Sequence, residues 1–188
     1  KLSNATHSGS DAYITYQGEN YWFGEASGHK NIFTGQATNF NRVFYNKRNF
    51  NADIDYWDMS NAVGTAEMFK NSRNFNQDIG SWDLSSNESF WAMFHNAKKF
   101  NQDISGWNTS SAVTFSTMFV GAHKFNQDIG SWDTSNVITM VNMFKGAKKF
   151  NQDIGGWNTS NVTNFTRMLE GAFDFNNGGS SNINNWNV

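Results

Sequence analysis

Residues 143–154 read Met-Phe-Lys-Gly-Ala-Lys-Lys-Phe-Asn-Gln-Asp-Ile, and near-copies of this stretch recur every 25 residues along most of the chain. A Phe-Asn pair returns without drift from Phe50 to Phe175, and Ile, Trp and Met follow it at fixed distances. A fixed period with fixed apolar positions indicates a repeat protein. Each repeat can bury its apolar side only by stacking on its neighbours.

The apolar columns of the repeat predict the core. We expect identical side chains to lie above one another, about 4.8 Å apart where backbones pair, as continuous internal ladders. A column of small residues indicates where the coil wall comes too close for a larger side chain. The columns are Phe50, Phe75, Phe100, Phe125, Phe150 and Phe175; Ile54, Ile79, Ile104, Ile129 and Ile154; Trp57, Trp82, Trp107, Trp132 and Trp157; Met68, Met93, Met118, Met143 and Met168; and Ser72, Ala97, Ala122, Ala147 and Ala172.

The pattern within one repeat predicts an α/β repeat solenoid: a right-handed stack of about seven coils, with short parallel strands and single helical turns. Met118 to Ala122 is typical of one helical turn ended by Gly. The Phe-Asn-Gln-Asp-Ile stretch, as in Phe75 to Ile79, is the best strand candidate, with Phe and Ile facing inward. The Asn column that begins at Asn51 is expected to bond through stacked amides along the ladder.

The two ends of the chain depart from the repeat, as terminal coils should. Residues 1–33 are expected to form an N-terminal cap, with a hairpin of Ala12–Tyr16 and Tyr21–Gly24. Residues 34–177 are the solenoid, and 178–188 an irregular partial coil in which Ile183 and Trp186 resume the Ile and Trp positions. Because the chain stops in mid-coil, we expect Ile183 and Trp186 to pack against another chain.

Composition excludes several classes of protein. Hydrophobic residues make up 38% of the chain and aromatic residues 16%, so the core depends on large rings. The net charge of −2 predicts no bulk attraction to nucleic acid or to anionic membranes. No apolar run has the length of a membrane span, which predicts no membrane insertion. The chain has no Cys, so disulfides and thiolate metal sites are excluded.

The run from Met143 to Ile154, continued by Trp-Asn-Thr-Ser-Asn-Val-Thr from Trp157, resembles a repeat family of microbial surface proteins first noted in mycoplasma lipoproteins. That family is a domain of unknown function and is similar to the BspA-type leucine-rich repeats. The resemblance covers about residues 40–177. It implies a leucine-rich-repeat-like solenoid, exposed at a cell or particle surface and associated with adhesion or recognition. It implies no activity and carries no catalytic residues.

The polar columns offer two candidate sites. An acidic column of Asp53, Asp78, Asp103, Asp128 and Asp153 could hold calcium, which prefers carboxylate oxygens. We prefer the interpretation that each Asp accepts backbone N–H bonds within its own turn, and so predict no cofactor and no calcium dependence. A basic ridge could hold an anionic glycan or another subunit, or be a solvated face. Its cations are Arg48, Arg73, Lys98, Lys99, Lys124, Lys148 and Lys149, with His123 interrupting one row.

The remaining polar residues point to no enzyme. Thr109, Thr134 and Thr159 could form a hydroxyl row on one edge, although capping of turns is the commoner role. The four His residues share no column or metal-ligand spacing. We therefore expect a non-enzymatic, extracellular or cell-surface (or virion-surface) module that binds a protein or glycan on another surface. The alternative is a structural protein that assembles end to end into a fibre or coats a particle.

Overall fold

The computed structural model describes residues 6–8, 11–16, 19–22 and 34–186. Three short strands, β1 (Thr6–Ser8), β2 (Asp11–Tyr16) and β3 (Glu19–Trp22), form an antiparallel sheet in the order β1-β2-β3. The pairing of β2 with β3 is the expected hairpin, but its second strand begins at Glu19 rather than at Tyr21. The role of residues 1–33 as a cap stays a prediction, because their side chains lie outside the described part of the chain.

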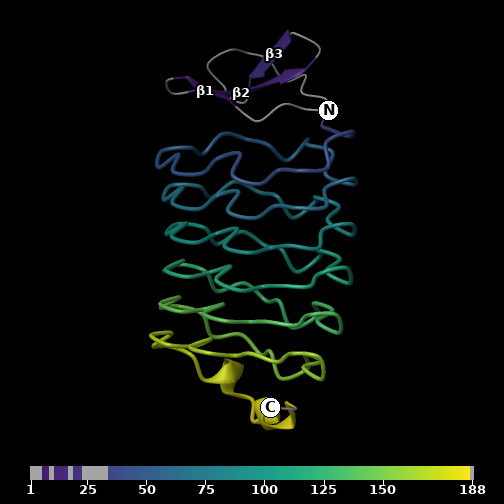
Figure 1. The fold of residues 1–188 in the computed structure, drawn as a ribbon. Coiled ribbons are helices and arrows are strands. Elements are labelled where there is room, and N and C mark those ends of the chain that lie inside the picture. Colours follow the sequence, from purple (N-terminus) through teal and green to yellow (C-terminus); the bar gives the residue numbers. More distant parts are fainter. Residues whose placement is uncertain (1–5, 9–10, 17–18, 23–33, 187–188) are drawn as a thin grey trace.

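From residue 34 onward the chain winds into coils that lie on one another in sequence order (Figure 1). Single parallel bridges, 25 residues apart, join neighbouring coils. The bridge residues are Asn39, Gly64, Ser89, Thr114, Thr139 and Asn164. Among residues 34–176, all of which the structure describes, the only β-pairing is through these single bridges. The predicted short parallel strands are not formed there.

The helical turn predicted at Met118–Ala122 and its equivalents is wrong. In this part of each coil, every second backbone N–H donates to a carbonyl of the next coil instead of its own. In residues 65–72, Glu67 N–H donates to Trp91 O at 2.9 Å, whereas Met68 N–H donates back to Thr65 O at 3.1 Å. Two positions per coil have left-handed φ, which no α-helix allows. The second of them is Asn46, Asn71 and Asn96, then Gly121, Gly146 and Gly171. These are the two residue types that adopt this conformation most readily.

The expected strand at Phe75–Ile79 is also absent, although Phe75 and Ile79 are fully buried as predicted. The Oδ1 atom of each Asn accepts the backbone N–H of the Asn in the next coil, as Asn51 does from Asn76 at 2.7 Å. Gln77 Nε2 adds a bond to Asn51 O at 2.9 Å. The Asn column therefore bridges coils from side chain to backbone, and the predicted amide-to-amide ladder is found instead at Asn46, Asn71 and Asn96.

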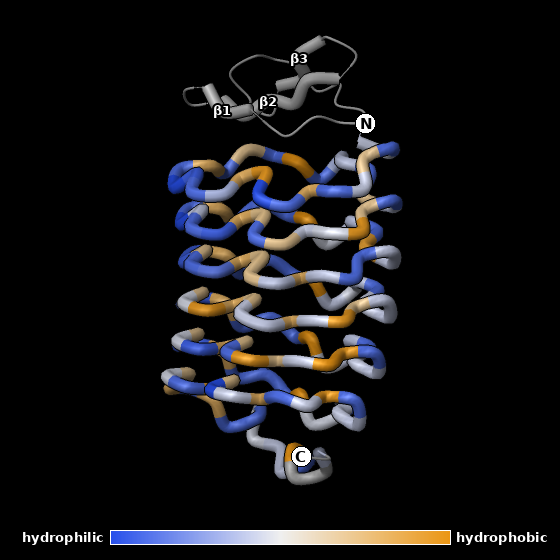
Figure 2. The backbone as a smooth tube through the Cα atoms, in the orientation of Figure 1, coloured by the Kyte–Doolittle hydropathy of each residue, from blue (hydrophilic) through white to orange (hydrophobic). Residues whose placement is uncertain are grey.

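The aromatic ladders form the core as predicted. Phe75 and Met93 are fully buried and Trp82 is 3% exposed. Rings of successive coils are stacked, with centroids 5.5 Å apart for Phe69 and Phe94 and 6.2 Å apart for Trp107 and Trp132. From Trp82 to Trp157, each buried indole also donates its Nε1 proton to an Ile carbonyl of the preceding coil. Hydrophilic residues gather where the coils turn at the sides of the stack (Figure 2).

The Thr column lies inside this core and forms no exposed hydroxyl row. Thr109, Thr134 and Thr159 are at most 3% exposed. The hydroxyl of Thr109 donates to Asp133 O at 2.9 Å, and that of Thr134 to Asn158 O at 2.9 Å. Met59 and Leu84 occupy the same column in earlier coils and are buried too. Thr109 and Thr134 are accommodated because their hydroxyls donate to a carbonyl one coil further along.

The C-terminal segment folds back onto its own stack. Two 3-10 helices, η2 (Asn177–Gly179) and η3 (Asn182–Asn185), lie at the end of the last coil (Figure 1). Trp186 stacks on Trp157, and Ile183 packs against the same core. These two side chains therefore resume their columns within their own chain, and their packing against another chain stays a prediction. The four-residue insertion at residues 178–181 is taken up by η2 and the two Ser residues that lead into η3.

Candidate functional site

The basic ridge is a continuous surface feature of the coil stack. Arg73, Lys99, Lys124, Lys148 and Lys149 are exposed, and Lys98 is half-buried. Backbone hydrogen bonds join neighbouring coils at both ends of the ridge, from Lys99 N–H to Arg73 O and from Asp174 N–H to Lys148 O, each at 3.2 Å. Backbones paired in this way are about 4.8 Å apart. The predicted ridge residues are therefore brought together in two adjacent columns with a fixed period.

The cations of the ridge are mostly uncompensated. Within the described residues, Lys149 pairs with Asp174 at 2.8 Å, and the other ridge cations form no ion pair. The ridge holds seven of the 14 Lys and Arg residues, so the rest of the chain carries seven cations against 16 carboxylates. Cations about 5 Å apart in water repel by roughly 1 kcal/mol per neighbouring pair. An anion along the ridge would remove this repulsion.

His123 lies in the same column, between Lys98 and Lys148. Burial lowers its pKa, and the charges of Lys148 and Lys98 lower it further. The two cations are thus close enough to disfavour a third positive charge between them. The imidazole therefore reports a positive potential at the middle of the ridge.

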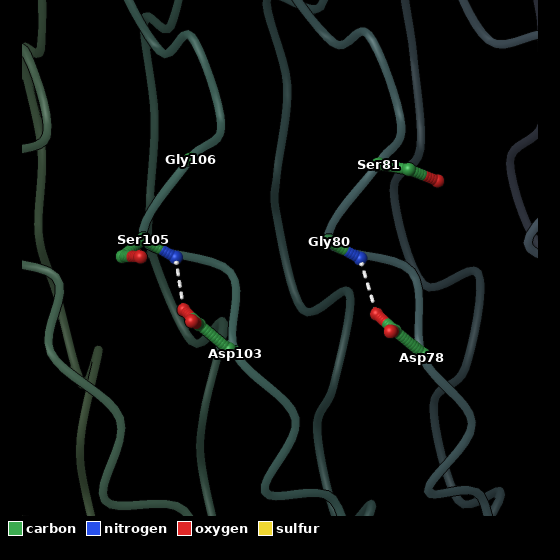
Figure 3. Close-up of a pocket in the computed structure, with 6 residues that line it drawn as sticks. All are labelled: Asp78, Gly80, Ser81, Asp103, Ser105 and Gly106. Carbon is green, nitrogen blue, oxygen red and sulfur yellow. Dashed lines mark hydrogen bonds between the residues drawn. The ribbon is translucent and has the colours of Figure 1, made fainter.

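The acidic column holds its carboxylates within their own turns. Asp78 accepts the N–H of Gly80 at 2.9 Å, and Asp103 that of Ser105 at 2.9 Å (Figure 3). The same bond recurs at Asp53, Asp128 and Asp153. Asp78 and Asp103 also line a shallow depression of about 300 Å³ with Gly80, Ser81, Ser105 and Gly106. Among the described residues no three His, Asp or Glu side chains converge as metal ligands, and calcium independence stays a prediction.

The second acidic column caps turns in the same way. Asp83 accepts the N–H of Ser85 at 3.0 Å and Asp133 that of Ser135 at 2.9 Å. Hydrogen bonds from these Ser residues, side chain first and then backbone, lower the pKa of both carboxyls. Asn108 and Asn158 make the same backbone bond without a charge. The alternation of Asp and Asn in this column is therefore explained by capping.

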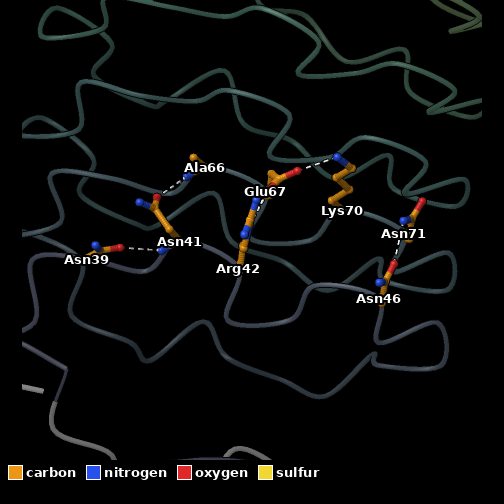
Figure 4. Close-up of polar contacts among 8 residues, drawn as sticks. All are labelled: Asn39, Asn41, Arg42, Asn46, Ala66, Glu67, Lys70 and Asn71. Carbon is orange, nitrogen blue, oxygen red and sulfur yellow. Dashed lines mark hydrogen bonds and ion pairs between the residues drawn. The ribbon is translucent and has the colours of Figure 1, made fainter. Parts of the chain in front are cut away.

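A buried carboxylate between two cations was missed by the sequence analysis. Glu67 is 3% exposed and pairs with Arg42 in one direction and with Lys70 in the other (Figure 4). Burial raises the pKa of Glu67, but the bonds from Lys70 and Arg42 outweigh it and the net shift is downward. Its column has no consensus, with Ala92 and Thr117 in the next coils, so only spacing within the folded stack reveals the cluster.

A column of exposed apolar side chains is separate from the ridge. Val63, Val113 and Ile138 are 39–49% exposed and are linked coil to coil, with Glu88 between the first two, by backbone bonds. Trp91 is 40% exposed, and Lys70 Nζ lies 5.6 Å from its ring centroid. Trp91 lies outside the Trp column of the repeat. This departure from the repeat is the sequence feature that indicates a Trp outside the buried ladder.

These observations define a protein of stacked 25-residue repeats with polar columns on its surface. The family described as Mycoplasma protein of unknown function, DUF285, matches residues 20–123 and again 103–188. The chain belongs to this family, and the resemblance inferred from the repeat is confirmed. Comparison with curated proteins and with solved structures gives no match. No helix among the described residues has the length and apolar character needed to span a bilayer.

Proposed function

We propose that this chain is a non-enzymatic recognition module, displayed at a cell or particle surface, that binds an anionic protein or glycan through its basic ridge. The observation that carries the proposal is the row of cations from Arg48 to Lys148 at a fixed period, which form no ion pair within the described residues. We assign the scaffold to leucine-rich-repeat-like solenoids of right-handed coils. Such quasi-one-dimensional stacks present extended binding surfaces rather than enclosed pockets.

Rigidity supports this role. The indole and Asn bonds tie every coil to the next, so ridge cations are held at fixed heights by a packed core. A preorganised row loses little conformational freedom when it binds. Long Lys side chains adapt their tips while their backbone positions stay fixed.

End-to-end assembly is the alternative, and the last coil is the feature that favours it. Phe173 is 79% exposed beside Phe175, and Trp186 is only half-buried on the outer side of the stack. A second chain could cover these rings. The measurement that separates the two functions is light scattering over a range of concentrations, because assembly raises the mass whereas a monomeric binder keeps it constant.

A matched pair of variants tests the proposed function. Lys98→Gln with Lys124→Gln removes two ridge charges, and Lys145→Gln with Arg167→Gln removes two cations next to Glu170, outside the ridge. Surface plasmon resonance would measure binding to immobilised acidic proteins and acidic polysaccharides, with neutral polysaccharide as a blank. We expect the ridge pair alone to weaken binding, and added salt to weaken it further. Equal behaviour of both variants on every acidic probe would contradict the proposal.

A further inference from the structure

The period of the ridge restricts the shape of its ligand. Asn74 N–H donates to Arg48 O at 3.1 Å, and Lys99 N–H to Arg73 O at 3.2 Å, so the backbone itself sets the spacing of the cations. At about 4.8 Å per coil, the four steps from Arg48 to Lys148 span about 20 Å. A matching partner carries acidic groups at regular intervals along a line. Linear acidic polymers have this property, whereas the carboxylates on a folded protein without internal repeats share no common period.

The groups between the cations suit a polyhydroxylated polymer. Asn49, Asn74 and His123 fill the ridge positions that lack Lys or Arg, and their amide and imidazole groups both donate and accept hydrogen bonds. No Phe, Tyr or Trp occupies the ridge columns between Arg48 and Lys149, and His123 is their single aromatic ring. Single-stranded nucleic acids bind largely through stacking of bases on such rings. The ridge is therefore better suited to sugar hydroxyls and acidic groups than to bases.

The C-terminal end of the ridge changes character. Phe173 continues the column of Lys98 and Lys148 and is 79% exposed, and Asp174 neutralises Lys149. An acidic group of the ligand meets no unpaired ridge cation beyond this point. The exposed ring instead offers an apolar surface for the C–H face of a sugar.

We propose that the ligand of the ridge is a linear acidic polysaccharide that lies along the coil axis, with successive acidic groups against successive coils. This inference rests on the proposed function, and it adds the chemistry and the direction of the ligand. Each additional sugar residue engages a further level of cations until the polymer spans the ridge. Phe173 contacts the sugar at the end of the row.

The test is a length series. Isothermal titration calorimetry would measure the affinity of the full chain for oligogalacturonates of increasing length, in which every sugar carries a carboxylate. We expect affinity to rise with length and then level off. Lys98→Gln with Lys99→Gln interrupts the middle of the ridge and should weaken the longest oligomer by about fivefold while affecting the shortest less. Lys145→Gln with Arg167→Gln should leave the series unchanged, and circular dichroism checks that all variants fold.

Phe173→Ala separates a glycan from other polyanions. It should weaken the longest oligogalacturonate and leave binding of inorganic polyphosphate unchanged. Tighter binding of single-stranded DNA of equal charge would overturn the inference in favour of nucleic acid. Ridge-dependent binding of acidic proteins with no length dependence on the glycan would overturn the inference and leave the proposed function standing. Insensitivity of every probe to the ridge variants would overturn both.

Discussion

The indole of Trp186 lies on that of Trp157, with ring centroids 6.2 Å apart and planes 4° from parallel. Its Nε1 donates to Ile154 O at 3.2 Å, the bond that every inner Trp of the column from Trp82 onward makes with the coil before it. The four extra residues at the end of the chain therefore do not break the ladder. They are taken up by η2 and the short link to η3, and the ladder continues through the last coil.

Trp132→Ala should destabilise the stack by about 3–5 kcal/mol, because it leaves a cavity inside the ladder. It also leaves Ile104 O without its indole donor. Urea denaturation followed by circular dichroism measures the change. Trp91→Ala is the matched control, since its ring is 40% exposed, and it should cost less than about 1 kcal/mol. Similar costs for both variants would show that the Trp column is not a core.

Trp186→Ala should cost about 1–2 kcal/mol, less than an inner Trp, because its ring is only half-buried. The loss should be confined to the last coil. Hydrogen exchange is therefore expected to increase for the amides of Trp157 and of residues 162–176, and to stay unchanged near Trp82. An increase along the whole stack would contradict a local role. If the variant also forms oligomers, the uncovered Trp157 ring is the surface that associates.

Gly146→Asn should be nearly neutral, whereas Gly146→Val should cost about 1–2 kcal/mol or more. Gly146 has φ of 70°, and Asn96 adopts a φ of 57° at the equivalent position two coils earlier. Space is not the limit, because the nearest atoms to an added Cβ are 3.8 Å away in Gly121. Thermal denaturation of the two variants compares them directly. Equal melting temperatures would show that the left-handed conformation is not what selects the residue.

Glu67→Gln should lower the free energy of unfolding at neutral pH by roughly 1–3 kcal/mol, because two charge-assisted hydrogen bonds lose their charge. The pKa of Glu67 is lowered in the folded state, so its contribution is present above the unfolded pKa and is lost as pH falls through the folded pKa. The difference between wild type and variant should therefore shrink in acid. Glu170→Gln removes an exposed, paired carboxylate and serves as the control. A constant difference at all pH values would refute the linkage.

Binding of a sulfated polysaccharide should strengthen as pH falls from about 8 to about 5, the range in which His residues titrate. His123 is neutral at the upper end because burial and its two Lys neighbours lower its pKa, and an anion on the ridge favours its protonation. Sulfate does not titrate in this range, so the ligand charge is constant. His123→Asn should reduce the pH dependence.

A chelator should change neither ligand binding nor the melting temperature, because each Asp of the acidic column already accepts a backbone N–H within its own turn. A large fall in melting temperature with chelator would instead reveal a structural metal.

The sequence alone determined the repeat, the buried columns and the ridge. A period of 25 residues without drift requires equivalent residues to share an environment, so burial of Phe75 and exposure of Lys99 followed from the pattern. The bonds of Asp78 and Asp103 to nearby N–H groups were predicted because they are local. The same local reasoning supported the hairpin at β2 and β3.

The tertiary structure decided everything that depends on a partner one coil away. Met118–Ala122 is typical of a helix locally, but Phe119 N–H bonds to Met143 O of the next coil, and the left-handed φ of Thr117 and Gly121 allows it. Thr134 is typical of an exposed turn, yet a carbonyl 24 residues later lets its hydroxyl lie inside. Trp186 returns to its own column for the same reason. A donor and acceptor separated by a whole coil leave no local mark on the sequence, and only stacking brings them within hydrogen-bond distance.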